Sequence, residues 1–163
     1  MTILSLSIGS NINAQENIRL AVNALRTEFG ELNCSKVYES EAVGFEGDNF
    51  LNLVVTIETK RPLRELQNYL KKLEDKLGRD RTQIKFSGRT MDIDILTYES
   101  DNDSNIELPR AEITENAFVL QPLAELLPDE LHDKSGLTYA LLWQAYDKSV
   151  QRLWPIDFDW QGD

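Results

Sequence analysis

The sequence predicts an α+β fold, because stretches of alternating apolar residues and stretches of helically spaced apolar residues follow one another in the order β-α-β-β-α-β. The expected strands cover residues 2–9, 34–40, 50–59 and 91–96, and the expected helices between them cover 13–29 and 62–77. This order is that of a ferredoxin-like sandwich, in which helices pack on one face of an antiparallel sheet. Later helical patterns predict a helical C-terminal extension, and we expect residues 1–163 to form one domain.

The first strand ends at Gly9 and leads into a helix whose apolar residues repeat at helical spacing as far as Phe29. Asn13 is a suitable N-cap for this helix, and Glu16 follows three residues later, as in a capping box. Gly30 suits the end of the helix.

The strand at 34–40 and the strand at 50–59 are separated by a glycine-containing loop. In the later strand, odd-numbered apolar residues form one face, so Phe50 and Asn52 are expected on the opposite face. Pro62 then begins the second helix, because proline is tolerated in the first helical turn.

The C-terminal part predicts a helix at 114–126, capped by Thr114, and a last helix at 139–148. Apolar residues alternate again at 156–160, where the tail is expected to dock as an edge strand. The only histidine, His132, lies between these elements and is expected in a surface loop.

Composition limits which binding partners and which cellular compartment are expected for this chain. The net charge is −11 and the pI about 4.6, which argues against binding to nucleic acid along its backbone but leaves room for a small polyanion held by a local basic cluster. The chain has no apolar run of about 20 residues and no basic leader, so neither a membrane span nor a signal peptide is expected. The single cysteine, Cys34, excludes an internal disulfide framework and favours a reduced, cytoplasmic setting.

The most informative motif is an aspartate pair, Asp92 and Asp94, that follows Arg89 inside an apolar run. In a strand these carboxylates share one face and lie roughly 6–7 Å apart, so they can hold Mg²⁺ between themselves and a polyphosphate. Phe50 and Asn52 should lie on the same face of the sheet. The alternative is a strand with one solvated face, although paired acids in mid-strand repel each other.

Several segments in a fixed order resemble the family of 6-hydroxymethyl-7,8-dihydropterin pyrophosphokinases, over about residues 3–128. The segments are Ile8-Gly9-Ser10-Asn11, Phe50-Leu51-Asn52, Glu74 with Leu77-Gly78-Arg79, Gly88-Arg89-Thr90-Met91-Asp92-Ile93-Asp94-Ile95, and Phe118-Val119-Leu120-Gln121-Pro122-Leu123-Ala124-Glu125. The family fold is the same ferredoxin-like sandwich. The resemblance implies an ATP-dependent enzyme of folate biosynthesis in which the pterin hydroxymethyl oxygen attacks the β-phosphorus of ATP and AMP leaves.

The resemblance also implies a site. Two Mg²⁺ ions would be held by Asp92 and Asp94, with ATP as co-substrate and a reduced pterin as acceptor. The catalytic residues implied are Arg79, Arg89, Asp92 and Asp94. The ATP contacts implied are Glu74, Arg81, Lys85, Arg89, Ile95 and Arg110. The pterin contacts implied are Ser40, Val43, Gly44, Phe50, Asn52 and Phe118, in which Phe50 and Phe118 sandwich the ring. We expect a monomer.

Two positions depart from the family pattern. A histidine is usual where this chain has Arg110, and an arginine is usual where it has Asn116. Losing one charge-assisted hydrogen bond costs about 1.5–3 kcal/mol, so the sequence predicts an active enzyme with weak ATP binding. It also predicts that Asn116→Arg tightens ATP binding. Two alternatives stay open: a paralogue that binds a pterin or nucleotide without turnover, and an unrelated Mg²⁺-dependent phosphohydrolase.

Overall fold

The computed structural model describes residues 2–41, 49–77, 91–98, 108–149 and 151–160. In chain order its elements are β1 (Thr2–Ser10), α1 (Ala14–Phe29), β2 (Leu32–Cys34), β3 (Val37–Ser40), β4 (Phe50–Thr59), α2 (Leu63–Lys76), β5 (Asp92–Tyr98), α3 (Glu112–Glu115), α4 (Ala117–Leu126), β6 (Leu131–His132), β7 (Leu137–Thr138), α5 (Tyr139–Ala145) and β8 (Leu153–Ile156). No helix in this part of the chain has the length and apolar character needed to cross a membrane.

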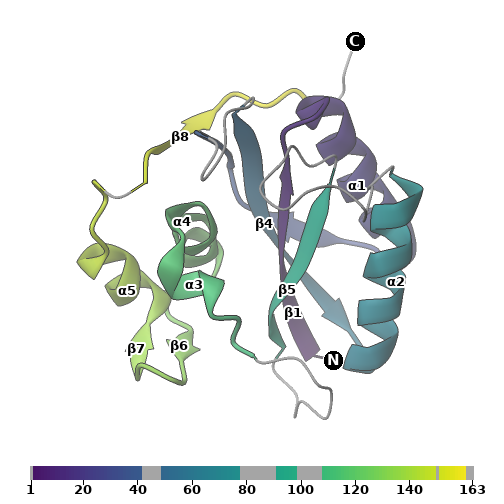
Figure 1. Cartoon of the computed structure of the whole chain (residues 1–163). Coiled ribbons are helices and arrows are strands. Elements are labelled where there is room, and N and C mark those ends of the chain that lie inside the picture. The colour runs from purple at the N-terminus through teal and green to yellow at the C-terminus, as the bar shows by residue number, and fades with distance from the viewer. Residues whose placement is uncertain (1, 42–48, 78–90, 99–107, 150, 161–163) are drawn as a thin grey trace.

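The main sheet has the strand order β5-β1-β4-β3-β8, with β2 also paired to β4, and its pairs are antiparallel. The first four strands in this order reproduce the predicted ferredoxin-like arrangement, because β1 lies between β5 and β4, the strands directly after and before α2, and β3 lies beyond β4. Figure 1 shows α1 and α2 on one side of the sheet and α3, α4 and α5 on the other. The predicted α+β fold and helical extension are therefore confirmed.

The main core lies between the sheet and the layer of α1 and α2. Both helices present residues at helical spacing to it, such as Ile18, Val22 and Leu25 of α1, which are fully buried. Ile93 and Ile95 of β5 belong to the same core, as the alternation along the strand predicts.

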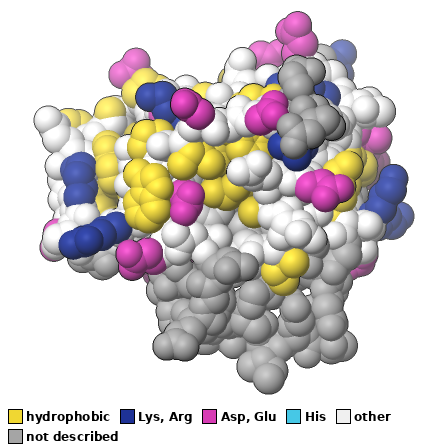
Figure 2. All heavy atoms as spheres, turned by 90° about the horizontal axis from the view of Figure 1, so that it is seen from above, with side chains coloured by type: hydrophobic (Ala, Val, Ile, Leu, Met, Phe, Trp, Pro, Cys, Tyr) yellow, Lys and Arg dark blue, Asp and Glu magenta, His cyan; other side chains and the backbone are white. Residues whose placement is uncertain are grey.

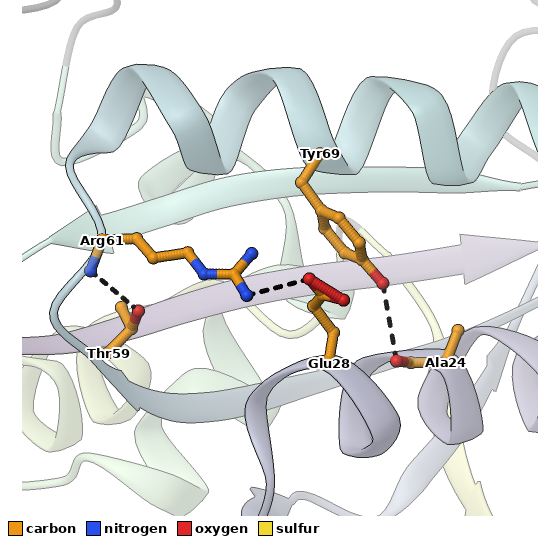
Figure 3. A network of polar contacts seen from close by, with 5 residues as sticks. All are labelled: Ala24, Glu28, Thr59, Arg61 and Tyr69. Carbon is orange, nitrogen blue, oxygen red and sulfur yellow. Dashed lines mark hydrogen bonds and ion pairs between the residues drawn. The ribbon is translucent and has the colours of Figure 1, made fainter.

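A polar network holds the two helices of this layer together (Figure 3). Arg61, which follows β4, pairs with Glu28 of α1 at 2.8 Å, and its backbone N–H donates to the Thr59 hydroxyl at 3.1 Å. The Tyr69 hydroxyl of α2 donates to the carbonyl of Ala24 in α1 at 3.5 Å. Arg61 and Glu28 are both about a third exposed, so their ion pair adds little to stability. Its main effect is to align α1 with α2.

A second, smaller core covers part of the opposite face of the sheet. It consists of Val54, Leu96, Ile113, Val119, Leu120, Leu123, Ala124 and Tyr139. The sheet face opposite α1 and α2, which was expected to be less covered, is therefore covered where α4 packs on β4. Leu96 joins this core because it lies on the same face of β5 as Asp92 and Asp94. A shift of register between Ser5 and Leu6 of β1 marks a β-bulge at Leu96, after which Thr97 lies opposite Ser5.

Two predictions for the N-terminal half are wrong in detail. The expected strand at 34–40 is divided into β2 and β3, because the Ser35 hydroxyl accepts the Val54 N–H at 2.9 Å between them. The expected capping box does not form: Asn13 has a left-handed backbone (φ 45°) and makes no side-chain cap bond. Instead the Asn17 amide donates to the Ile12 carbonyl at 2.7 Å.

Three predictions for the C-terminal half also need correction. The helix expected at 114–126 is broken into α3 and α4, because Asn116 between them has an extended backbone. The helix expected at 139–148 ends at Ala145, where Tyr146 becomes extended. His132 is not in a surface loop: it lies in the β6–β7 hairpin, is 5% exposed, and its Nδ1 is 2.8 Å from the Ser135 hydroxyl.

The tail forms an edge strand, but earlier than its apolar alternation indicated. β8 pairs with β3 at Leu153–Ile156, and the residues after it pack on α1, where Arg19 donates to the Asp159 carbonyl at 2.8 Å. Figure 2 views the molecule from the end at which β8 lies, and shows hydrophobic side chains gathered there among charged ones. Trp154 of β8 remains 38% exposed.

Candidate active site

A row of three residues crosses the sheet at one end. Asp92 of β5 lies opposite Gly9 of β1, and Gly9 lies opposite Asn52 of β4. Opposed residues on neighbouring strands point to the same face, so the carboxylate and the amide are separated by two strand spacings, roughly 10 Å between their backbones. The predicted convergence of Asp92 and Asn52 on one face is therefore present.

Gly9 makes this row possible. A Cβ atom at Gly9 would lie 2.5 Å from Oδ1 of Asn52, far inside van der Waals contact. The Asn52 side chain therefore leans over the Gly9 backbone, towards the strand that separates it from Asp92. Sequence reasoning quoted Gly9 as part of a motif but gave it no role. The available signal was a glycine at the end of a buried strand, which often marks a close approach of another group.

The other end of the Asn52 amide faces β3. Its Nδ2 donates to the Ser40 hydroxyl at 3.4 Å, and both side chains are about 95% buried. Ser40 in turn lies opposite the half-buried Phe50. Three of the expected pterin contacts, Ser40, Phe50 and Asn52, thus adjoin one another on β3 and β4.

Asp94 lies two residues after Asp92 on the same face of β5, opposite Ser7 of β1. Its side chain is 39% exposed. Its Oδ1 is 3.8 Å from the Arg110 guanidinium. Asp92 is half-buried on the same strand face. Two carboxylates two residues apart on one face of β5 are the kind of ligand that Mg²⁺ takes from a protein when phosphate oxygens supply others.

Arg110 is fixed to the outer edge of β5 through its backbone and its side chain. Its N–H donates to the Leu96 carbonyl at 3.0 Å, and its Nε donates to the Ile95 carbonyl at 2.9 Å. The guanidinium then reaches Asp94 on one side and Glu112 at 3.7 Å on the other. Burial, with the Asp94 charge, raises the pKa of Glu112, and the Arg110 charge opposes that rise.

Glu74 contacts the same edge from α2. It is 6% exposed, and its Oε2 accepts the backbone N–H of Ile93 at 2.9 Å. A cavity of about 220 Å³ lies beside it, lined by Gln67, Leu70, Lys71, Glu74, Ile93, Ile95 and Arg110. The structure therefore brings together three of the expected ATP contacts, Glu74, Ile95 and Arg110, around one cavity.

Phe118 lies in the first turn of α4, is half-buried and packs against the second core. That core includes Val54, which follows Asn52 on the same face of β4. The helix of Phe118 therefore packs on the sheet face that carries Asn52. Six expected site residues lie outside the described residues: Val43, Gly44, Arg79, Arg81, Lys85 and Arg89.

Asn116 makes a contact that the sequence did not indicate. Its Oδ1 accepts a hydrogen bond from Nε2 of Gln151 at 2.9 Å. Oε1 of the same glutamine accepts a hydrogen bond from the Ala117 N–H at 2.8 Å. The two residues are 35 positions apart, and no local pattern predicts such a pairing.

Comparison with known proteins identifies related chains. A family model described as 7,8-dihydro-6-hydroxymethylpterin-pyrophosphokinase (HPPK) matches residues 5–128. A 2-amino-4-hydroxy-6-hydroxymethyldihydropteridine pyrophosphokinase of Bacillus subtilis is 35% identical over 130 residues, which are 76% of this chain and 77% of that protein. The protein of the same name from Aquifex aeolicus is 34% identical over 81% of this chain and 84% of its own length.

Longer relatives match over part of their length. A folate synthesis bifunctional protein of Chlamydia caviae is 33% identical over 85% of this chain, which spans only 33% of that protein. Among solved structures, an HPPK-DHPS in complex with substrates superposes with a TM-score of 0.71 at 13% identity, over 91% of this chain and 43% of that one. The wild-type HPPK-DHPS of Plasmodium falciparum superposes with a TM-score of 0.62 at 17% identity, over 88% of this chain and 40% of that one. At these identities the two structures show a shared fold.

Proposed function

The chain belongs to the 7,8-dihydro-6-hydroxymethylpterin-pyrophosphokinase family, and from this membership we propose that it transfers pyrophosphate from ATP to 6-hydroxymethyl-7,8-dihydropterin in folate biosynthesis. The hydroxymethyl oxygen forms a bond to the β-phosphorus of ATP. The bond from that phosphorus to the oxygen bridging to the α-phosphate breaks, AMP leaves, and the hydroxyl proton is released. The family match over 5–128, which contains the row Asp92–Gly9–Asn52, is the observation that carries this proposal.

The pterin is a flat ring with donors and acceptors on its edge, so it needs in-plane partners and stacking surfaces. Asn52 supplies both a donor and an acceptor, and its buried position beside Gly9 and Ser40 fixes its direction. Phe50 and Phe118 are proposed to stack on the two faces of the ring. Ser40, with the backbone at Val43 and Gly44, is proposed to complete its edge.

The phosphates are proposed to lie at the Asp92 and Asp94 end. These carboxylates fit Mg²⁺, because they share one strand face and Asp94 remains 39% exposed. When bound, Mg²⁺ would neutralise phosphate oxygens, and we propose two such ions. Arg79 and Arg89, with Arg81 and Lys85, are proposed to approach the phosphates from the segment between α2 and β5.

The nucleotide is proposed to occupy the cavity between α2 and the outer edge of β5. Leu70 and Ile95 offer apolar surface, while Gln67 and Lys71 offer polar groups. Glu74 is proposed to shape this cavity by holding the Ile93 N–H, and Arg110 to face the phosphates beside Asp94. On this arrangement ATP lies along β5 and the pterin lies over β4, with the aspartates between them.

The experiment that tests the function is production of AMP from millimolar ATP and Mg²⁺, with and without hydroxymethyldihydropterin, followed by chromatography. AMP that forms only with the pterin, together with pterin pyrophosphate, supports the proposal. Asp94→Ala is expected to abolish turnover and to leave pterin binding intact, because the carboxylate serves the phosphates. Pterin binding without AMP would instead identify a non-catalytic paralogue, and phosphate release without pterin would identify a phosphohydrolase.

A further inference from the structure

The C-terminal segment lies outside the family-matched residues 5–128, yet it contacts the chain directly before Phe118. The Tyr146 hydroxyl donates to the Glu115 carbonyl at 2.9 Å. Gln151 accepts the Ala117 N–H at 2.8 Å and donates to Asn116 Oδ1 at 2.9 Å. Both contacts meet the junction between α3 and α4, so a segment far along the sequence holds the start of the Phe118 helix.

The Gln151 contacts replace a missing cap. Asn116 precedes α4 but makes no side-chain cap bond of its own, and Ala117 is fully buried. A buried N–H in the first turn of a helix needs an acceptor, because no carbonyl of the same helix can reach it. Gln151 supplies that acceptor from another part of the chain, and its second bond, to Asn116, orients the same amide.

The opposite end of α4 is held separately. Glu125 accepts the Tyr38 hydroxyl at 2.6 Å and the Lys36 N–H at 2.9 Å, so that end is tied to the β3 side of the sheet. Gln151 therefore controls the end that carries Phe118, and a change at Gln151 is expected to move this end while the other stays in place.

The same segment also reaches the opposite side of the proposed pterin site. Two residues after Gln151, Leu153 begins β8 and pairs with Ser40 of β3. Ser40 accepts the Asn52 amide. Two residues of chain extend at most roughly 7 Å, so this short connection limits how far the start of α4 can move from Ser40 and Asn52.

We propose that Gln151 is a positioning residue for the pterin: by capping α4 and joining it to β8, it sets the place of Phe118 relative to Asn52. This inference rests on the proposed function, because it assumes that a pterin binds between these residues. It predicts a contribution to pterin binding from a residue beyond the family-matched part of the chain.

The test uses the full chain and compares three variants by calorimetric titration with hydroxymethyldihydropterin. Gln151→Leu keeps the side-chain size and removes both bonds, so pterin binding is expected to weaken about tenfold. Gln151→Glu keeps the acceptor for the Ala117 N–H at a helix start, where negative charge is favoured, and the Asn116 amide can turn to donate its Nδ2 to the new carboxylate. This variant should therefore bind the pterin within about twofold of the wild type. Gln144→Leu, an equal change at an exposed position of α5, is the matched control and should have no effect.

A readout specific to positioning comes from Phe118. In a Phe118→Ala background, Gln151→Leu is expected to weaken pterin binding no further, because the ring through which it acts is gone. In otherwise wild-type protein, the KM for ATP should stay unchanged, and amide exchange in the first turn of α4 should accelerate with or without pterin.

The two proposals fail differently. If the wild type binds no pterin, the proposed function falls, and the inference with it. If the wild type binds the pterin, and Gln151→Leu binds it equally well or weakens it equally in the Phe118→Ala background, only the role of Gln151 is overturned.

Discussion

Arg110 lies beside Asp94 with its guanidinium 3.8 Å from the carboxylate, and it is held there by the Ile95 carbonyl at 2.9 Å. The arginine is thus attached to the same strand whose acid it faces. Its second partner, Glu112, lies 3.7 Å away on the other side. Since all these groups are partly exposed, the arrangement fixes the direction of Arg110 more than it adds stability.

This geometry predicts that Arg110 contributes to ATP binding. Arg110→Gln removes a positive charge directed at the phosphate end of the site, so the KM for ATP is expected to rise about tenfold while pterin binding without ATP stays unchanged. Steady-state kinetics with varied ATP would measure the first effect and calorimetry the second.

The control is Arg61→Gln, the same chemical change at a residue that pairs with Glu28 and does not line the nucleotide cavity, so it should leave the KM for ATP unchanged. A lower KM in Arg110→Gln would show the reverse of our prediction: that the guanidinium obstructs the cation at Asp94.

Gly9 is predicted to be essential for the pterin contact of Asn52. In Gly9→Ala the new methyl group would meet Oδ1 of Asn52 at 2.5 Å, so the amide must turn away or the strands must separate. We expect pterin binding to weaken more than tenfold and stability to fall by about 1–3 kcal/mol, the usual cost of overpacking. Calorimetry and denaturant unfolding measure the two effects.

Ser7→Ala serves for comparison, because Ser7 points to the same face one row away and the change adds no volume. In the double variant Gly9→Ala/Asn52→Ala, the clash is absent and most of the lost stability should return. Unchanged pterin affinity in Gly9→Ala would contradict the close approach of Asn52 as the reason for the glycine.

The sequence predicted the parts of this molecule that follow from local periodicity. Alternation in β4 and β5 correctly placed Ile93 and Ile95 in the main core and Asn52 with Asp92 on the other face. These predictions succeeded because a strand buried on one side repeats every two residues.

The failures lie where distant residues act on local structure. His132 looked like a loop residue, but the β6–β7 hairpin and Tyr139 bury it. The break between α3 and α4 at Asn116 coincides with the contacts from Gln151. The second core forms where α3, α4 and α5, which follow β5 in the chain, pack back on the sheet face that carries Val54 and Leu96. None of these long-range pairings leaves a periodic signal.

Glu74 is predicted to act mainly through β5. Because its carboxylate accepts the Ile93 N–H, Glu74→Leu would leave a buried donor without its partner and should cost about 1–3 kcal/mol of stability. Glu74→Gln retains an acceptor oxygen and should cost much less. Denaturant unfolding compares the two, with Glu65→Leu on the exposed side of α2 as a control. If Glu74→Gln were equally destabilising, the charge rather than the hydrogen bond would be responsible.

Asn116→Arg is predicted to affect the two substrates in opposite directions. The added charge lies where related enzymes are expected to hold ATP, so ATP binding should tighten, by about tenfold for one charge-assisted hydrogen bond. The same change removes the Oδ1 that accepts Gln151, so the start of α4 loosens and pterin binding should weaken. Asn116→Asp keeps an acceptor for Gln151 without adding a positive charge, and should retain pterin affinity. Calorimetric titration of each variant with each ligand separates these effects. No gain in ATP affinity would show that position 116 does not face the nucleotide here, and unchanged pterin affinity would show that the Gln151 contact does not control Phe118.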